Sequence, residues 1–198
     1  MNTIAIHIAA FAGSLRQASF NRRLLEIAAT LLPENTTMNI LDLAPLPLFN
    51  EELEQDGFSA AIQEFRKGLF NADAILIATP EYNASIPGIL KNAIDWASRG
   101  ENRQPGPLNG KPLAIIGAGG RSGTMRAQNH LRQITSHLNM YTINKPEVLV
   151  AMTPTQVFDP SGNLTDETAV KLIAQLLNNL VAYTRQQKLR PVEAVTVN

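Results

Sequence analysis

The chain has 198 residues, of which 17 are Lys or Arg and 17 are Asp or Glu, so its formal net charge is zero. This length predicts one domain, and the lack of a positive excess argues against a nucleic acid or a membrane surface as partner. Hydrophobic residues make up 44% and charged residues 17%, a mixture typical of a chain with a core. No cysteine is present, which excludes disulfides, thiolate zinc sites, iron–sulfur clusters and cysteine nucleophiles.

The N-terminal segment is apolar, but no run in the chain approaches the roughly 18 to 20 residues of a membrane span. We interpret the run Ile4–Phe11 as a first buried strand rather than a signal peptide. No basic segment precedes it, and a Gly-Ser-Leu-Arg turn follows instead of a cleavage site. These features predict a soluble, cytoplasmic protein.

Short apolar runs alternate with longer amphipathic ones along the chain, which predicts strands alternating with helices. In chain order, the pattern predicts a strand over Ile4–Phe11, a helix over Phe20–Leu32, a strand over Met38–Leu43, a loop over Ala44–Gly57, a helix over Phe58–Phe70, a strand over Ala74–Thr79, a helix over Pro87–Ser98, a loop over Glu101–Gly110, a strand over Pro112–Ile116, a helix over Gly123–Leu138, a strand over Glu147–Ala151, a helix over Thr165–Gln187 and a loosely ordered tail over Leu189–Asn198.

Five strands that alternate with five helices indicate right-handed βαβ units and an open, doubly wound parallel sheet of the α/β class. In such sheets a ligand binds beyond the carboxyl ends of the strands, where the strand order reverses. The loops that follow strands one, three and four are therefore candidates for the site. They are Gly13–Asn21, Pro80–Pro87 and Gly117–Gly123, and each opens onto a predicted helix.

The first loop carries the groups of an anion site. Ser14 and Ser19 supply hydroxyls, Arg16 a guanidinium and Asn21 an amide, next to the N–H groups of a helix start. A phosphate is the expected anion, although the loop is neither a Walker loop nor a dinucleotide fingerprint. The structural alternative is that Ser19 is only an N-cap and Arg16 only a solvated charge.

The second loop contains two prolines, which stiffen it, and Tyr82, which supplies an aromatic face for a flat ligand. In the helix that follows, Lys91 and Asp95 have the spacing of an i,i+4 ion pair, and we expect Trp96 in the core. In the third loop, three of the four glycines, Gly117, Gly119 and Gly120, permit close approach of a ligand to the backbone. The alternative for this loop is a simple tight turn.

The three histidines show no ligand spacing. His7 alternates with isoleucines on a predicted buried strand, so we interpret it as a core or edge residue. His130 and His137 lie seven residues apart on one helix and are expected at the surface or in an interface. Neither a metal site nor a catalytic histidine is predicted.

Two motifs together resemble those of the NADPH-dependent FMN reductase family. The first is Gly-Ser-Leu-Arg-x-x-Ser-x-Asn after strand one, and the second is Thr-Pro-Glu-Tyr-Asn-x-Ser-x-Pro-Gly-x-Leu-Lys-Asn-Ala-x-Asp-Trp after strand three. The resemblance extends from Ile4 to about Leu180. It implies that residues 1–198 form a single flavodoxin-like domain, a three-layer sandwich with a five-stranded parallel sheet of order 2-1-3-4-5.

The resemblance also implies a cofactor, FMN, and a donor, NADPH or NADH. Hydride passes to FMN and then to a small-molecule acceptor (a quinone, chromate, an azo compound or free flavin) by a ping-pong reaction that needs no catalytic side chain and no metal. The residues that match the family's phosphate loop are Ser14, Arg16, Ser19 and Asn21. Those that match its isoalloxazine loop are Pro80, Glu81, Tyr82 and Asn83, and those that match its third flavin loop are Gly117, Gly119, Gly120 and Ser122.

Members of this family are usually dimers or tetramers with the flavin near the subunit interface. The resemblance therefore implies that Arg126 and Glu147 pair across subunits near Tyr82; the alternative is two unrelated surface charges. Two other functions stay open at this stage. One is an electron carrier like flavodoxin, against which the zero net charge and Arg16 argue, and the other is a non-enzymatic binding domain. The sequence does not decide the acceptor, the preferred nicotinamide, the oligomeric state or how tightly FMN is held.

Overall fold

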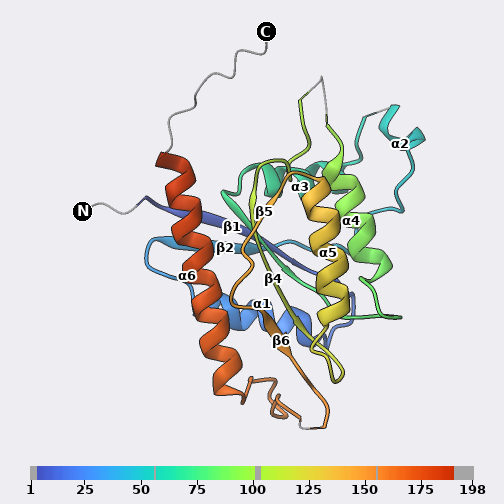
Figure 1. Ribbon diagram of the computed structural model, residues 1–198. Helices are drawn as coiled ribbons and strands as arrows, with labels where there is room; N and C mark the ends of the chain where they lie inside the picture. Colours follow the sequence, from blue (N-terminus) through green and yellow to red (C-terminus); the bar gives the residue numbers. More distant parts are fainter. Residues whose placement is uncertain (1–3, 56, 101–103, 155, 190–198) are drawn as a thin grey trace.

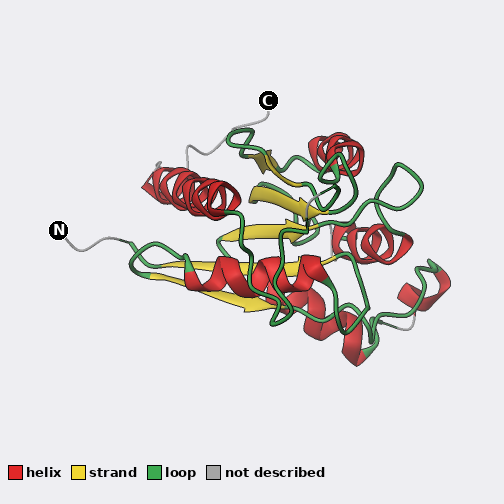
Figure 2. Ribbon diagram, turned by 90° about the horizontal axis from the view of Figure 1, so that it is seen from below, coloured by secondary structure: helices red, strands yellow, loops and turns green. Residues whose placement is uncertain are grey.

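The computed structural model describes residues 4–55, 57–100, 104–154 and 156–189, and within them a parallel sheet has helices on both faces (Figures 1 and 2). In chain order the elements are β1 (Ile6–Ala12), α1 (Phe20–Thr30), β2 (Thr36–Ile40), α2 (Glu52–Gln55), α3 (Ala60–Phe70), β3 (Ala74–Ala78), α4 (Gly88–Ser98), β4 (Pro112–Ala118), α5 (Met125–His137), β5 (Tyr141–Thr142), β6 (Val148–Val150) and α6 (Glu167–Leu189).

The strand order is β2-β1-β3-β4-β5, with β6 also paired to β4, and every pairing is parallel. The predicted order 2-1-3-4-5 is confirmed. The predicted fifth strand is one half of a broken edge strand: β5 pairs with Pro112 and Leu113 at the start of β4, and β6 pairs with Ile116–Ala118 at its end. The sheet of the described residues therefore has six strands where five were expected.

The central strands β1, β3 and β4 are buried on both faces, as their continuous apolar runs predict. Alternate side chains point to opposite faces of the sheet. One face packs against α1 and α6 and forms a core with Ile8 and Leu76 at its centre. The other packs against α3, α4 and α5 around Phe11 and the fully buried Trp96. Figure 2 shows these helical layers on the two sides of the sheet.

Local capping explains where the helices begin. Ser19 and Ser59 accept backbone N–H bonds at the starts of α1 and α3, and Asp166 accepts those of Thr168 and Ala169 at the start of α6. Helix α4 begins at Gly88 with Pro87 as its N-cap, one residue later than predicted.

Several predicted bounds were wrong: β2 lies at Thr36–Ile40 rather than Met38–Leu43, and α3 begins at Ala60 rather than Phe58. The expected loop Ala44–Gly57 contains the short helix α2, and α5 begins at Met125 rather than Gly123. Gly123 and Thr124 have φ angles of 57° and 71°, outside the helical region, so they belong to the preceding turn. Helix α6 ends at Leu189, and the predicted loose tail beyond it lies outside the described residues, as does part of the predicted loop Glu101–Gly110.

Several smaller predictions are confirmed. Lys91 Nζ lies 2.7 Å from a carboxylate oxygen of Asp95. His7 is a partly buried strand residue whose Nδ1 lies 2.9 Å from the Thr37 hydroxyl, and His130 and His137 are exposed. Among the described helices, none is long and apolar enough to cross a membrane.

Candidate functional site

The loops that follow β1, β3 and β4 meet around a hollow of about 390 Å³ at the carboxyl edge of the sheet. The predicted site residues that line it are Ser14, Arg16, Ser19, Asn21, Pro80, Glu81, Tyr82, Gly119 and Gly120. A neighbouring hollow of about 400 Å³ shares Glu81, Gly119 and Gly120 with it and adds Asn83 and Ser122. The two hollows form one groove along the second and third loops. Gly117, the remaining predicted residue, lines neither.

The first loop places an uncompensated helix start at one end of this groove. The Ser19 hydroxyl accepts the N–H of Arg22, so Ser19 is an N-cap, which was the structural alternative to its predicted contact with the phosphate. Within the described residues the N–H groups of Phe20 and Asn21 have no hydrogen-bond partner, and the first turn of α1 contains no acidic side chain. The positive end of α1 is therefore available to an anion.

Arg16 is exposed, its backbone N–H donates to the Ser14 hydroxyl at 3.4 Å, and the one hydrogen bond of its side chain to the described residues is a 3.5 Å contact from Nη2 to the carbonyl of Ala18. Such a long contact holds the guanidinium only weakly. The side chain can therefore turn toward an anion at the start of α1, where Ser14 adds a hydroxyl from the same loop.

Asn21 has a structural role that the sequence did not indicate. Its Nδ2 donates to the carbonyl of Ala118 and its Oδ1 accepts the N–H of Ala118, both at 2.9 Å, and the side chain is only 3% exposed. The amide thus joins the start of α1 to the end of β4. Because both polar atoms of the side chain are engaged, the predicted contact of Asn21 with a phosphate has to come from its backbone N–H.

The second loop is stiffened by a tight hairpin turn. Tyr82 and Ser85 exchange two backbone hydrogen bonds of 3.0 Å, while Asn83 and Ala84 between them have φ angles of 50° and 59°. Two successive positive φ values are typical of a type I′ turn. The Ser85 hydroxyl lies 3.0 Å from Nδ1 of His130, which fastens the turn to α5. Two prolines and this turn hold the loop rigid.

Glu81 connects the second loop to the start of α5. Helix α5 lacks a side-chain cap of its own, because Thr124 adopts a left-handed conformation. The Glu81 carboxylate replaces that cap: it accepts the N–H groups of Arg126 at 2.9 Å and Ala127 at 3.2 Å, and Arg126 Nε donates to it at 2.6 Å.

This arrangement keeps Glu81 ionised. Burial alone would raise the pKa of its carboxyl group, but the hydrogen bond from the Arg126 side chain, the backbone donors and the charge of Arg126 together outweigh burial and lower the pKa. Because the carboxylate is occupied inside the chain, any contact of Glu81 with a ligand in the groove has to come from its backbone.

The glycines of the third loop serve different purposes. A Cβ atom on Gly117 would lie 2.5 Å from the Thr79 carbonyl oxygen, and one on Gly123 would collide with the backbone of Leu149, so both positions need glycine for packing. Gly120 faces open space with a φ of 35°. Gly119 and Gly120 are thus the two glycines that let a ligand approach the backbone, whereas Gly117 belongs to β4.

The groove fits FMN. One end offers helix N–H groups, hydroxyls and a guanidinium, which a phosphate requires. The other is bounded by a rigid turn, the half-exposed ring of Tyr82 and the backbone of Gly119 and Gly120, which a flat ring system requires. No group of three or more His, Asp or Glu side chains that could hold a metal exists in the described part of the chain.

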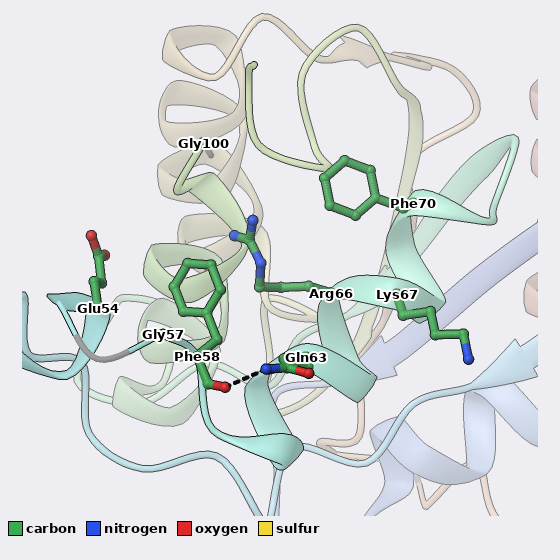
Figure 3. Close-up of a pocket in the computed structure, with 8 residues that line it drawn as sticks. All are labelled: Glu54, Gly57, Phe58, Gln63, Arg66, Lys67, Phe70 and Gly100. Carbon is green, nitrogen blue, oxygen red and sulfur yellow. Dashed lines mark hydrogen bonds between the residues drawn. The ribbon is translucent and has the colours of Figure 1, made fainter. Parts of the chain in front are cut away.

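A different hollow, of about 620 Å³, lies beside α3 (Figure 3). The buried Arg66 guanidinium is 4.2 Å from the centre of the Phe58 ring, and its Nη1 donates to the carbonyls of Trp96 and Arg99. Gly100, which lines this hollow, follows the end of α4, whereas the second loop precedes that helix. The hollow therefore lies at the opposite end of α4 from the second loop, and Arg66 joins α3 to the end of α4.

Comparison with known proteins agrees with this geometry. The sequence profile described as NADPH-dependent FMN reductase matches residues 6–155, three quarters of the chain. The chain belongs to the NADPH-dependent FMN reductase family. Its membership, FMN and NAD(P)H as cofactors, and the flavodoxin-like fold were all predicted and are confirmed.

Named relatives in the FMN reductase family have the same activity class. An NAD(P)H-dependent FMN reductase of Pseudomonas aeruginosa is 44% identical over 182 residues, 91% of this chain and 96% of that protein. An NADPH:quinone oxidoreductase of Arabidopsis thaliana is 45% identical over 90% of this chain and 92% of its own. The solved structure of the flavoenzyme NAD(P)H:(acceptor) oxidoreductase FerB from Paracoccus denitrificans has a TM-score of 0.81 and 30% identity, covering 92% of this chain and 98% of that one. This chain is therefore an NAD(P)H-dependent flavin oxidoreductase, an enzyme rather than an electron carrier.

Proposed function

We propose that the groove binds FMN with its phosphate at the start of α1 and its ring system between the second and third loops. The observation that carries this proposal is the free positive end of α1 beside Arg16, at one end of the groove. The N–H groups of Phe20 and Asn21, the hydroxyl of Ser14 and the Arg16 guanidinium hold the phosphate. Ser19 stays engaged with Arg22 and shapes the loop.

The second and third loops orient the ring system. The hairpin turn at Asn83 and the backbone of Gly119 and Gly120 offer donors and acceptors to the edge of the ring, and Tyr82 covers part of it. Bound FMN supplies the redox chemistry, taking hydride from NAD(P)H and passing electrons to an acceptor. The chain has only to hold the ring, favour negative charge at its edge with rigid backbone donors, and leave one face open.

Replacing Arg16 tests the placement of the phosphate. A charge-assisted hydrogen bond contributes about 1.5–3 kcal/mol, so Arg16→Ala should weaken the binding of FMN to apoprotein roughly tenfold to a hundredfold. Lys171→Ala, which removes an exposed cation on α6, is the matched control and should change nothing. Calorimetric titration that gives both variants the wild-type affinity would place the phosphate elsewhere.

Quinones are the acceptor class that we propose, because several relatives are named as quinone reductases. One open face has to receive the nicotinamide and the quinone in turn, which makes the reaction ping-pong. Initial rates at several quinone concentrations should give parallel double-reciprocal lines with NADPH. Converging lines would mean that both substrates bind at once and would exclude a shared face. Chromate, azo dyes and free flavin belong in the same acceptor screen.

Assembly into dimers or tetramers around Arg126, Glu147 and Tyr82 stays a prediction. Within the chain, Arg126 is bound to Glu81, and Lys145 Nζ lies 3.1 Å from Glu147, so neither charge depends on a second subunit for a partner. Arg126→Glu would also break the bond to Glu81, so Glu147→Lys is the better test. Light scattering should give it a lower mass than wild type, and an unchanged mass would exclude Glu147 from the interface.

The remaining expectations concern location and other partners. We expect a cytoplasmic location and no binding to nucleic acid or membranes, in line with the zero net charge of the chain. Cell fractionation would check the location. Co-sedimentation with lipid vesicles and with DNA would check the two partners.

A further inference from the structure

The first loop also borders a second hollow, of about 490 Å³, which no step of the proposed function uses. It shares Arg16, Ser19 and Phe20 with the flavin groove, but no residue of the second or third loop. Its opposite wall is the segment 156–162 that follows β6. The hollow therefore begins at the end of the groove where the flavin phosphate is proposed to bind, and continues away from the ring.

Three arginines, Arg16, Arg22 and Arg23, line this hollow together with the carboxylates of Glu26 and Asp159, which leaves an excess of one positive charge. Arg23 holds the wall in place, since its Nε donates to the carbonyl of Gly162 at 2.8 Å and its Nη1 lies 2.8 Å from a carboxylate oxygen of Glu26. Arg22 has only the distant Glu26, at 3.9 Å, and its side chain is 55% exposed. Arg16 and Arg22 are thus two weakly held cations at the edge of a built cavity.

A carboxylate and an aromatic ring complete the lining. Asp159 accepts the N–H of Asn163 at 2.8 Å and its Nδ2 at 2.9 Å, which fixes the orientation of the carboxylate. Each carboxylate oxygen can accept further bonds, for example from hydroxyl groups. Phe20 lines both hollows and packs against Phe158 with ring centres 4.8 Å apart. Cations for a phosphate, an acceptor for ribose hydroxyls and an aromatic surface for a base match the three parts of an adenylate.

From these observations we propose that the arginine-lined hollow is an adenylate subsite and that the chain binds FAD as well as FMN. FAD is FMN whose phosphate is joined to AMP. A ligand that fills both the groove and this hollow therefore has to continue beyond the flavin phosphate, as FAD does. The second phosphate meets Arg16 and Arg22, and Asp159 accepts from the ribose. The inference rests on the proposed position of the FMN phosphate.

Calorimetric titration of the apoprotein with FMN and with FAD tests the proposal. Wild type should bind FAD within tenfold of FMN. Arg22→Ala should weaken the affinity for FAD about tenfold and leave the affinity for FMN within twofold of wild type. The reason is that Arg22 lines the arginine-lined hollow and does not line the flavin groove. AMP alone should compete with FAD and not with FMN. Lys171→Ala, the control cation on α6, should change neither affinity.

The contrary outcomes distinguish a wrong adenylate subsite from a wrong position of FMN. FAD weaker than FMN by more than tenfold, or equal losses of both flavins in Arg22→Ala, would overturn the adenylate subsite while FMN binding stands. Failure of FMN itself to bind would instead overturn the proposed function. An adenylate is also part of NADPH: if Arg22→Ala raised the KM for NADPH relative to NADH and left FAD affinity unchanged, the hollow would hold the donor's phosphorylated adenylate and the FAD proposal would be wrong.

Discussion

Replacing Glu81 by glutamine removes a charge from a side chain that is only 9% exposed, while it preserves the shape of that side chain. The carboxylate accepts bonds from the N–H groups of Arg126 and Ala127 and from the Arg126 guanidinium. A bond to a charged group contributes about 1.5–3 kcal/mol against about 0.5–1.5 kcal/mol for a neutral one. Glutamine retains one acceptor oxygen and loses the charge, so we expect the free energy of unfolding to fall by about 2 kcal/mol.

Urea unfolding and thermal melting of the apoprotein measure this loss. For a domain of this size about 2–4 °C of Tm corresponds to 1 kcal/mol, so Glu81→Gln should melt about 4–8 °C below wild type. Arg126→Ala is the matched control, because the Arg126 side chain is 61% exposed and the backbone bonds to Glu81 survive its removal. It should cost under about 1 kcal/mol. Equal losses in the two variants, or no loss in Glu81→Gln, would refute the role of Glu81 as the cap of α5.

The same carboxylate gives a pH dependence whose sign is determined by its lowered pKa. An unfolded glutamate titrates near 4.5, and Glu81 in the folded chain titrates below that value. Its contribution is therefore complete above the unfolded pKa and is lost as the pH falls through the folded pKa. The stability difference between wild type and Glu81→Gln should be constant near pH 7 and shrink below about pH 4.5. A difference that grew in acid would contradict the assignment.

Four further substitutions test the loops by urea unfolding. Gly117→Ala should destabilise by about 3 kcal/mol or more, because its Cβ meets backbone, whereas Gly120→Ala, which faces open space and is strained only by its left-handed φ of 35°, should cost about 1–2 kcal/mol; equal costs would contradict this. Asn21→Ala leaves the buried polar groups of Ala118 unpaired and should cost about 2–4 kcal/mol; a loss under 1 kcal/mol would show that water replaces the amide. Ala84→Gly should be neutral or stabilise by up to about 1 kcal/mol, since it relieves a left-handed alanine, and a clear loss would argue against strain there.

Periodicity alone located the central sheet, because β1, β3 and β4 are long enough to show it and are buried on both faces. Helix α2 and strand β5 were missed for the opposite reason. They contain four and two residues, too few for any period to be visible. The break between β5 and β6 depends on which part of β4 each half pairs with, and that pairing is a tertiary property.

At the site, the sequence predicted that the three loops lie together, because the carboxyl ends of parallel strands lie at one edge of the sheet. For Ser19 it offered the N-cap only as the alternative to a phosphate contact, and the cap is what the structure shows. The bond from Asn21 to Ala118 joins residues 97 positions apart and leaves no local signal. Thr124 is misleading, because threonine before a helix is typical of an N-cap, and only its left-handed backbone shows that Glu81 takes that role.

In the proposed FMN complex, the occupied start of α5 also has a consequence for the direction in which the flavin lies. Two helices, α1 and α5, begin beside the groove, and each start attracts negative charge. At α5 the Glu81 carboxylate already satisfies that attraction, while at α1 the N–H groups of Phe20 and Asn21 are unpaired within the described residues. A flavin bound in the reverse direction would bring its phosphate against a carboxylate. We therefore propose that the neutralised start of α5 directs the flavin phosphate to α1, and Glu81→Gln should weaken that preference as well as the fold.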